Sequence, residues 1–462
     1  MPTNIPQHVF RQYDIRGKVA DEITPDVVRA IGAAYAAGFV DRPAPTLAVG
    51  RDLRTTSEAL AQAAIEGILS TGVNVVDVGQ APTPGVYFAI GLWGLDGGMG
   101  ITASHRPADE NGIKVRMGDG PFYGEDLQRL KERVVAGGYP SGEGGYEQRD
   151  FYPDYFRLAE QQLKIDRPMR VVLDLGNGCG TLTAPRLLKA LGCELTLLFA
   201  EPDGAFPGRG PDPTKDGAMD ALRSKVLQTG AEIGVAIDAD GDRVAVVDHA
   251  GDEVQPDEYM IPVCREVLSQ GPAAIVSEVR CSQSIVDDVL AHGGTVSLEA
   301  CGYPFILQGM REQAAEIGFE TTGHCYFNDP YFKFDDATYA AGRLLGALSR
   351  TEQSLRDIVA EAPIYYPSDP PRYACPNDLK FQVVEQVAAS YSEGSDLNRQ
   401  DGVRATYEGG WGVLRASNTA EELVLRWEGN NPQARDRIGE DLMGKLRDAL
   451  ASHGLPLTPT GH

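Results

Sequence analysis

Residues 46–78 of the chain, TLAVGRDLRTTSEALAQAAIEGILSTGVNVVDV, decide the fold class. Residues 46–50 form a short apolar run that predicts a buried strand, and residues 73–78 predict a second one. Between them, Ser57–Leu69 predicts a helix, with Ser57 as the candidate N-cap. Because strands that alternate with helices are typical of a mainly parallel sheet, we predict an α/β fold.

The same alternation recurs further along the chain. The elements that we predict there are strands at 170–175 and 233–237 around a helix at 183–191, and then a strand at 273–277 before a helix at 284–291. After a proline cluster the order changes to helix 379–390, strands 403–407, 411–414 and 423–428, and helix 432–452. This order is typical of a smaller α+β domain.

Four domains follow from these elements. We predict three mixed α/β-sheet domains and a smaller C-terminal α+β domain, with the ranges 1–149, 150–251, 252–366 and 367–462. A charged and glycine-rich stretch, 137–150, is predicted to be a linker.

The composition narrows the class of protein. The chain has 462 residues, of which 42% are hydrophobic, and no apolar run is long enough to span a bilayer. It shows no signal peptide, and its seven cysteines are scattered without a CxxC pair, so we expect a cytoplasmic protein. The net charge of -24 argues against nucleic acid and anionic membranes as partners. An anionic substrate would need a local basic site, for which the motif loops offer Arg11, Arg16, Arg51, Lys114, Arg243, Arg280 and Arg415.

A serine stands in a turn-rich loop at Thr102–Pro107, after the glycine-rich residues 97–100. The hydroxyl of this serine, Ser104, is a candidate for covalent chemistry, and Lys114, further along the chain, adds a cationic side chain. The loop lacks the glycines that flank a hydrolase nucleophile. Taken alone, this stretch is better explained as an ordinary surface loop.

Three carboxylates at alternate positions follow an apolar strand in Ile237–Arg243, IDADGDR. Like charges packed this closely disfavour one another, and a hard divalent cation would offset them. Oxygen ligands alone favour Mg²⁺ over Zn²⁺. A calcium EF-hand is excluded, because Arg243 takes the place of the required glycine and His249 that of the bidentate glutamate. The alternative to a metal site is an acidic turn that is exposed to solvent and binds no metal.

Two further loops are rich in polar side chains. Arg415–Thr419, RASNT, offers a guanidinium, hydroxyls and an amide, which are suitable donors for a phosphate. Glu320–His324, ETTGH, suits the recognition of sugar hydroxyls, and His324 can act as general acid or base. Each loop alone is also compatible with a simple polar turn.

In chain order, the serine loop, the aspartate loop, Glu320–His324 and Arg415–Thr419 resemble the α-D-phosphohexomutase family, and most of all its phosphomannomutase/phosphoglucomutase branch. The resemblance runs from Phe10 to about Glu428. It implies four domains around a central cleft and phosphoryl transfer between the 6- and 1-positions of mannose or glucose phosphates. It also implies Mg²⁺ as cofactor and a hexose 1,6-bisphosphate as intermediate and activator. The expected partners are small-molecule hexose phosphates, and we expect a monomer or a weak homo-oligomer.

The resemblance assigns roles to individual residues. Ser104 would be the phosphoserine, and Asp238, Asp240 and Asp242 would hold the metal together with a phosphate oxygen on Ser104. Lys114, Arg16, Arg243 and His324 match the positions around the reacting phosphoryl group. The residues implied for substrate binding are Tyr13, Arg280, Tyr303, Glu320, Thr322, His324, Arg415, Ser417, Asn418 and Thr419.

The chain departs from the family in its third domain. Residues 300–303 read Ala-Cys-Gly-Tyr where the family usually has Lys-x-Gly-His, and Arg280 stands where a lysine is common. Arginine retains the charge and changes the geometry, so these positions bear on the choice of sugar. The alternatives that stay open are a phosphoglucosamine mutase, a non-catalytic sugar-phosphate binding protein and a metal-dependent phosphatase.

Overall fold

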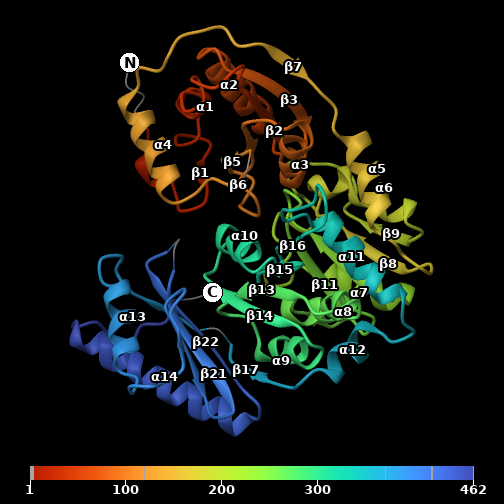
Figure 1. The fold of residues 1–462 in the computed structure, drawn as a ribbon, viewed down its shortest axis with the longest axis vertical. Coiled ribbons are helices and arrows are strands. Elements are labelled where there is room, and N and C mark those ends of the chain that lie inside the picture. The colour runs from red at the N-terminus through yellow and green to blue at the C-terminus, as the bar shows by residue number, and fades with distance from the viewer. Residues whose placement is uncertain (1–4, 119, 370, 418–419, 461–462) are drawn as a thin grey trace. The chain divides into compact units, whose positions relative to one another are not determined.

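The computed structural model describes residues 5–118, 120–369, 371–417 and 420–460. The chain divides into two compact units (Figure 1). The first combines Met1–Gln255 with Thr322–Arg356, and the second combines Pro256–Thr321 with Asp357–His462. The predicted α/β architecture with a C-terminal α+β region is confirmed by the sheets of these units. Among the described residues, no helix combines the length and the apolar character needed to cross a membrane.

The first sheet of unit 1 has the order β1-β5-β4-β2-β3-β7, with β6 beside β5. Its strands are β1 (Ile15–Lys18), β2 (Thr46–Arg51), β3 (Asn74–Gln80), β4 (Gly97–Ile101), β5 (Glu110–Met117), β6 (Gly120–Pro121) and β7 (Tyr146–Gln148). The helices around it are η1 (Gln7–Val9), α1 (Pro25–Ala36), α2 (Ser57–Leu69), α3 (Thr83–Trp93) and α4 (Glu125–Ala136). Strand β2 runs parallel to both β3 and β4, as the strand–helix–strand pattern predicts.

Close helix packing builds the core of this first domain. A Cβ on Gly32 of α1 would lie 2.6 Å from the Ala64 carbonyl oxygen, and one on Gly67 of α2 would lie 2.1 Å from that of Arg29. Only glycine fits at such contacts, so these two residues let the backbones of α1 and α2 touch. Apolar side chains of both helices, such as Ile31 and Ile68, are fully buried below them.

Two details differ from the sequence-based expectations. The N-cap of α2 is Thr56, and Ser57 is the first helical residue; its hydroxyl donates to Asp52 Oδ1 at 2.5 Å instead of capping the helix. The predicted linker 137–150 contains a strand, β7, which pairs parallel to β3. The side chains of β7 are exposed and none is aliphatic, so the apolar pattern that marks the other strands is absent there.

The second sheet of unit 1 has the order β12-β11-β10-β8-β9. Its strands are β8 (Arg170–Asp174), β9 (Glu194–Leu198), β10 (Ile233–Ile237), β11 (Val244–Asp248) and β12 (Glu253–Val254). The associated helices are α5 (Tyr152–Gln162), η2 (Cys179–Leu182), α6 (Ala184–Ala190), α7 (Asp220–Thr229) and α11 (Ala337–Ser349). Unit 1 also contains the short strand β16 (Cys325–Phe327), which is not part of this sheet. Every residue of β10 is buried, and this strand leads directly into the aspartate loop. Helix α11 contacts β10, β11 and α6, although it comes from the later segment of the chain.

Unit 2 contains the remaining two sheets. In the third, β13 (Ala274–Glu278) lies between β14 (Thr295–Glu299) and β15 (Ile317–Phe319), and the helices are α8 (Pro256–Leu268), α9 (Gln283–Ala291) and α10 (Tyr303–Glu312). Helix α12 (Leu355–Glu361) follows α11 in the chain. The fourth sheet consists of β17 (Tyr366–Pro367), β18 (Arg372–Ala374), β19 (Leu397–Asn398), β20 (Val403–Tyr407), β21 (Gly410–Ala416) and β22 (Glu422–Gly429), with α13 (Lys380–Ala389) and α14 (Pro432–Ser452).

A buried arginine joins the two sheets of unit 2. Arg404 on β20 donates to the carbonyl oxygens of Val279 at 2.7 Å and Cys281 at 2.8 Å, just beyond β13. Its guanidinium lies 3.5 Å from the ring centroid of Trp411. These contacts satisfy carbonyl groups that would otherwise be buried without partners, so they fix the end of β13 against the fourth sheet.

Candidate active site

The serine loop connects β4 to β5. Ser104 is buried and has a φ angle of +55°, a left-handed conformation that is strained for a residue with a Cβ atom. Its N–H group donates to Thr102 Oγ1 at 2.9 Å, and its Oγ lies 3.0 Å from Nδ1 of His105. The loop therefore holds the serine hydroxyl in one defined place.

Cationic side chains surround the histidine next to Ser104. The charge of Arg243, together with burial and the charge of Arg16, lowers the pKa of His105 well below its usual value. The imidazole of His105 is therefore neutral at physiological pH. The same positive charges that keep His105 neutral would attract an anion. A phosphate on Ser104 would need such an environment.

The aspartate loop begins where β10 ends. Asp238 Oδ1 accepts hydrogen bonds of 3.1 Å from three consecutive backbone N–H groups, those of Gly241, Asp242 and Arg243. Gly241 has a φ angle of +82°, which lets the loop turn so that these groups converge. Burial, with the charges of Asp242 and Asp240, raises the pKa of Asp238 well above its usual range. The three carboxylates therefore repel one another, and a bound cation would reduce this repulsion.

The three carboxylates fit a divalent metal ion. Oxygen atoms of Asp238, Asp240 and Asp242 lie within 4.8 Å of one another, and all three residues are buried. Asp238 Oδ2, Asp240 Oδ1 and Asp242 Oδ1 are buried without a hydrogen-bond partner. Buried carboxylate oxygens without partners are costly, and hard oxygen donors suit Mg²⁺. The acidic-turn alternative does not fit, because the three side chains are at most 1% exposed.

Lys114 on β5 faces the same carboxylates. Its Nζ lies 2.8 Å from Asp240 Oδ2 and also donates to Asp242 Oδ2. Burial opposes the charge of this ammonium group, but the two aspartates outweigh it and raise the pKa of Lys114 well above its usual value. Arg16 on β1 forms a two-pronged pair with Asp14. Unit 1 therefore contains all the residues expected around the reacting phosphoryl group that are described so far: Ser104, Lys114, Arg16, Arg243 and the three aspartates.

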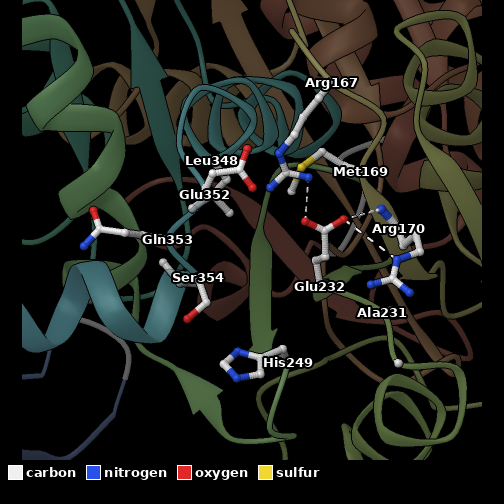
Figure 2. A pocket seen from close by; sticks show the side chains of 12 residues that line it. Arg167, Met169, Arg170, Ala231, Glu232, His249, Leu348, Glu352, Gln353 and Ser354 are labelled. Atoms are coloured by element: carbon white, nitrogen blue, oxygen red, sulfur yellow. Dashed lines mark hydrogen bonds and ion pairs between the residues drawn. The ribbon is translucent and has the colours of Figure 1, made fainter.

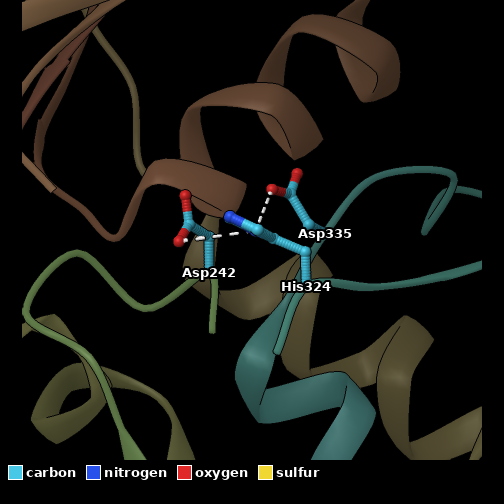
Figure 3. A group of neighbouring side chains, drawn as sticks. All are labelled: Asp242, His324 and Asp335. Carbon is cyan, nitrogen blue, oxygen red and sulfur yellow. Dashed lines mark ion pairs between the residues drawn. The ribbon is translucent and has the colours of Figure 1, made fainter. Parts of the chain in front are cut away.

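His324 is held between charged groups of unit 1 (Figure 3). Its Nδ1 lies 2.8 Å from Asp335 Oδ2 and 3.7 Å from Asp242 Oδ1, and its Nε2 accepts a hydrogen bond of 2.9 Å from Arg243 Nε. Burial lowers the pKa of His324, but Asp242 and Asp335 outweigh burial and raise it. Because Nε2 accepts from Arg243, this network assigns the proton of a neutral ring to Nδ1.

This tautomer bears on a second group of possible metal ligands. Asp242, His324 and Asp335 also have ligand atoms within 4.8 Å of one another. A protonated Nδ1 has no lone pair for a metal ion, and Nε2 is occupied by Arg243. We therefore regard the aspartate loop as the better candidate for a metal site, and Asp335 as a charged neighbour of the imidazole.

The predicted sugar-binding residues are divided between the units. Glu320 belongs to unit 2, whereas Thr322, His324 and the half-buried Tyr13 belong to unit 1. In unit 2, Arg280 follows β13 and forms a two-pronged pair with Glu278, with distances of 2.8 Å from Nε and 2.6 Å from Nη2. Glu278 also accepts from the backbone N–H of Thr321 at 2.9 Å. Tyr303 is the first residue of α10.

Glu278 is charged in spite of its burial. Burial raises its pKa, but the charge of Arg280 and hydrogen bonds from the Cys301 thiol and Thr321 outweigh this and lower it to about 2. The guanidinium of Arg280 is therefore held in a fixed orientation.

The predicted phosphate loop begins at the end of β21. Arg415 Nε donates to Asp401 Oδ2 at 2.7 Å, and the same oxygen accepts from the backbone N–H of Cys301 at 3.2 Å. Lys380 Nζ donates to the carbonyl oxygen of Ser417 at 2.5 Å, which supports the loop from α13. Asn418 and Thr419 lie outside the described residues.

A cavity of about 320 Å³ lies elsewhere in unit 1 (Figure 2). Its lining includes none of the predicted site residues. Glu232 accepts from Arg167 Nη1 at 2.7 Å and from the backbone N–H of Arg170 at 3.1 Å. Because an internal carboxylate already pairs with the Arg167 guanidinium, we assign no ligand to this cavity.

Family models match nearly the whole chain. Those described as α/β/α domains I, II and III and the C-terminal domain of phosphoglucomutase/phosphomannomutase match residues 7–137, 152–251, 255–366 and 372–445. A phosphomannomutase/phosphoglucomutase of Pseudomonas aeruginosa is 35% identical over 455 residues, which is 98% of each chain. A phosphoglucomutase of Neisseria meningitidis serogroup A is 34% identical and covers 94% of this chain and 96% of its own.

The solved structures give the same result. The crystal structure of a phosphoglucomutase/phosphomannomutase family protein from Burkholderia thailandensis superposes with a TM-score of 0.92 at 34% identity. The alignment covers 98% of this chain and 99% of that one.

Proposed function

Because the chain belongs to the phosphoglucomutase/phosphomannomutase family, we propose that it is a phosphohexomutase that moves phosphate between positions 6 and 1 of mannose or glucose. The observation that carries this proposal is the combination of Lys114 with three buried carboxylates that retain unpaired oxygens. The names of the full-length relatives support mannose and glucose phosphates as substrates.

Ser104 carries the phosphoryl group in the proposed reaction. The bond between phosphorus and Ser104 Oγ breaks, and a bond to a free hydroxyl oxygen of the hexose phosphate forms. The proton of that hydroxyl passes to a base, and the departing Ser104 Oγ takes up a proton, which regenerates the serine hydroxyl. The product of this half-reaction is a hexose 1,6-bisphosphate. The reverse half-reaction returns the other phosphate to Ser104, so that the net result is an isomerisation.

The charged residues of unit 1 have separate roles. Asp238, Asp240 and Asp242 would hold Mg²⁺, which would offset negative charge on the phosphoryl oxygens. Lys114 and Arg243 supply further positive charge. His324 is the proposed base, and Arg243 has to release Nε2 of His324 before that atom can accept a proton from the substrate.

Unit 2 is proposed to recognise the sugar and the phosphate that does not react. Arg280, Tyr303 and Glu320 would contact the sugar, with Thr322 of unit 1. Arg415, Ser417, Asn418 and Thr419 would hold the distal phosphate. Because Glu278 and Asp401 fix the two arginines, their guanidinium groups are pre-organised for an anion.

The test is a substitution of the phosphate carrier. Ser104→Ala should lose nearly all mutase activity with glucose 1-phosphate and mannose 1-phosphate, in the presence of Mg²⁺ and a hexose 1,6-bisphosphate. Ser269→Ala, which changes an exposed serine after α8, is the matched control. Intact-mass analysis should find one phosphate on the parent protein and none on Ser104→Ala. Full activity of Ser104→Ala would exclude the mechanism.

The same experiment separates the alternatives. A non-catalytic sugar-phosphate binding protein would bind the substrate without turnover, and it would stay unphosphorylated. A phosphatase would release inorganic phosphate as fast as the substrate disappears. The ratio of kcat/KM for mannose 1-phosphate, glucose 1-phosphate and glucosamine 1-phosphate would identify the preferred sugar.

A further inference from the structure

Arg54 lies three residues beyond β2, and its guanidinium contacts the backbone of the serine loop. Nη2 donates to the carbonyl oxygens of Ser104 and Arg106, both at 2.7 Å. Nη1 donates to the carbonyl oxygens of Pro107 at 2.6 Å and Glu110 at 3.1 Å. One side chain thus binds four carbonyl groups of the segment that begins at Ser104.

The guanidinium is itself fixed on its other edge. Arg54 Nε donates to Asp52 Oδ2 at 3.1 Å, and Asp52 Oδ1 accepts from the Arg54 backbone N–H at 3.0 Å and from the Ser57 hydroxyl at 2.5 Å. The Arg54 side chain is 0% exposed, and its Cζ lies 5.1 Å from the centroid of the Phe206 ring. Arginine has five N–H donors in a rigid fork, and these contacts engage all three of its nitrogen atoms.

A lysine at position 54 could not form these hydrogen bonds. An ammonium group has three donors on a single nitrogen atom, so it cannot bind four carbonyl groups and a carboxylate at once. A Lys variant would keep the positive charge while leaving some buried carbonyl oxygens without partners. It therefore separates the geometry of Arg54 from its charge.

The serine loop requires such support. Ser104 has a left-handed φ angle of +55°, and its own carbonyl oxygen is one of the four that Arg54 binds. A strained residue keeps its conformation only when surrounding contacts hold it. Since phosphoryl transfer depends on the placement of Oγ, a displacement of about 1 Å can reduce the rate by roughly 10²-fold.

We infer that Arg54 is a positioning residue, which holds Ser104 in its reactive conformation through the loop backbone. This inference rests on the proposed function, in which Ser104 carries the phosphoryl group. Because Arg54 acts through the loop, its loss should lower the rate of phosphoryl transfer and leave the binding of hexose phosphate nearly unchanged.

The experiment compares Arg54→Lys with Arg29→Lys. Arg29 is a partly exposed arginine on α1 that pairs with Glu66 and Asp26, so its variant controls for the loss of a guanidinium. For Arg54→Lys we expect kcat to fall by roughly 10²-fold with KM within about twofold of the parent value. Arg29→Lys should match the parent. A parent-like kcat of Arg54→Lys, or a rise in KM that accounts for the whole loss, would overturn the inference.

Hydrogen exchange provides a readout that does not depend on activity. Amides of residues 102–111 should exchange faster in Arg54→Lys than in the parent and in Arg29→Lys, while the rest of the chain stays unchanged. If the parent had no mutase activity, the proposed function would fail, and exchange would still decide whether Arg54 orders the loop. If Arg54→Lys did not fold, Asp52→Asn would provide the test: slower turnover with faster loop exchange supports the inference, and parent-like values of both refute it.

Discussion

Thr83 donates its hydroxyl hydrogen to Oδ2 of Asp240 across 2.6 Å, and its backbone N–H to the carbonyl oxygen of the same residue at 2.9 Å. Thr83 is the first residue of α3, which belongs to the first domain, whereas Asp240 belongs to the aspartate loop of the second. The position of this metal-loop carboxylate therefore depends on a helix from another sheet. Groups that orient metal ligands in this way influence metal affinity strongly.

Thr83→Val tests this dependence. Valine has nearly the same shape but no hydroxyl, so a buried carboxylate oxygen loses a donor. We expect the Mg²⁺ concentration for half-maximal activity to rise by roughly 10-fold, as for other residues that orient metal ligands. Thr83→Ser should retain the parent value, because it keeps the hydroxyl. Equal Mg²⁺ requirements of the Val and Ser variants would contradict this role.

Lys114→Met should make the protein dependent on metal for its stability. Without the ammonium group, the buried Asp240 and Asp242 lose their cationic partner, and breaking a buried ion pair costs about 3–5 kcal/mol. We expect a lower melting temperature without metal and a larger rise on addition of Mg²⁺ than in the parent. Thermal unfolding with EDTA and with saturating Mg²⁺ measures both values. The same Mg²⁺-induced shift in the variant and the parent would show that Lys114 does not balance these charges.

Asp336 predicts a specific pH dependence of stability. Burial raises its pKa from 3.8 to about 6, although it accepts hydrogen bonds from the Tyr339 backbone and the Tyr155 hydroxyl. The folded state therefore binds a proton more tightly than the unfolded state. Its stabilising contribution is complete below the unfolded pKa and is lost as the pH rises through about 6.

Asp336→Asn removes this effect and keeps an N-cap for α11. At about pH 8 the variant should be more stable than the parent by up to about 3 kcal/mol, and the gain should disappear towards about pH 4. Urea unfolding at several pH values measures the difference. A gain that does not change with pH would mean that the pKa of Asp336 is not raised.

Glu278→Gln should weaken substrate binding rather than turnover. Gln cannot balance the charge of Arg280, and its single acceptor oxygen cannot replace the two carboxylate oxygens that pair with the guanidinium. We expect KM for hexose phosphates to rise by roughly 10-fold, with a similar kcat, since a charge-assisted hydrogen bond contributes about 1.5–3 kcal/mol. Glu299→Gln on the neighbouring strand β14 is the matched control. A fall in kcat at constant KM would instead place Glu278 in the chemical step.

Regular elements and local motifs could be predicted from the sequence. Helices Ser57–Leu69 and Pro432–Ser452 have the predicted bounds because their apolar periodicity and their flanking residues agree. Strand β7 was missed, since its residues are exposed and none is aliphatic, and only the pairing with β3 makes them a strand. The aspartates of the candidate metal loop share one short motif, so the sequence alone singles them out, and their carboxylates do lie close together.

The supporting residues could not be predicted. Thr83 acts on a residue 157 positions away, and no local pattern marks it. Asp52 is buried and pairs with Arg54, and the sequence around it gives no sign of this contact. Asp335 stands beside Asp336, and this acidic pair before a helix was its only signal. Such roles arise from tertiary contacts, which a single sequence does not contain.

Residues 322–356 belong to unit 1, although they follow the first three strands of the third sheet in the chain. They carry His324, Asp335 and α11, whose Thr338 hydroxyl lies 2.7 Å from that of Thr183. A gene fragment that encodes only the first 255 residues would thus lack a helix of its own core and the proposed base. An exchange of residues 1–255 alone between relatives would therefore combine α11 of one protein with the core of another, although α11 packs on β10 and β11.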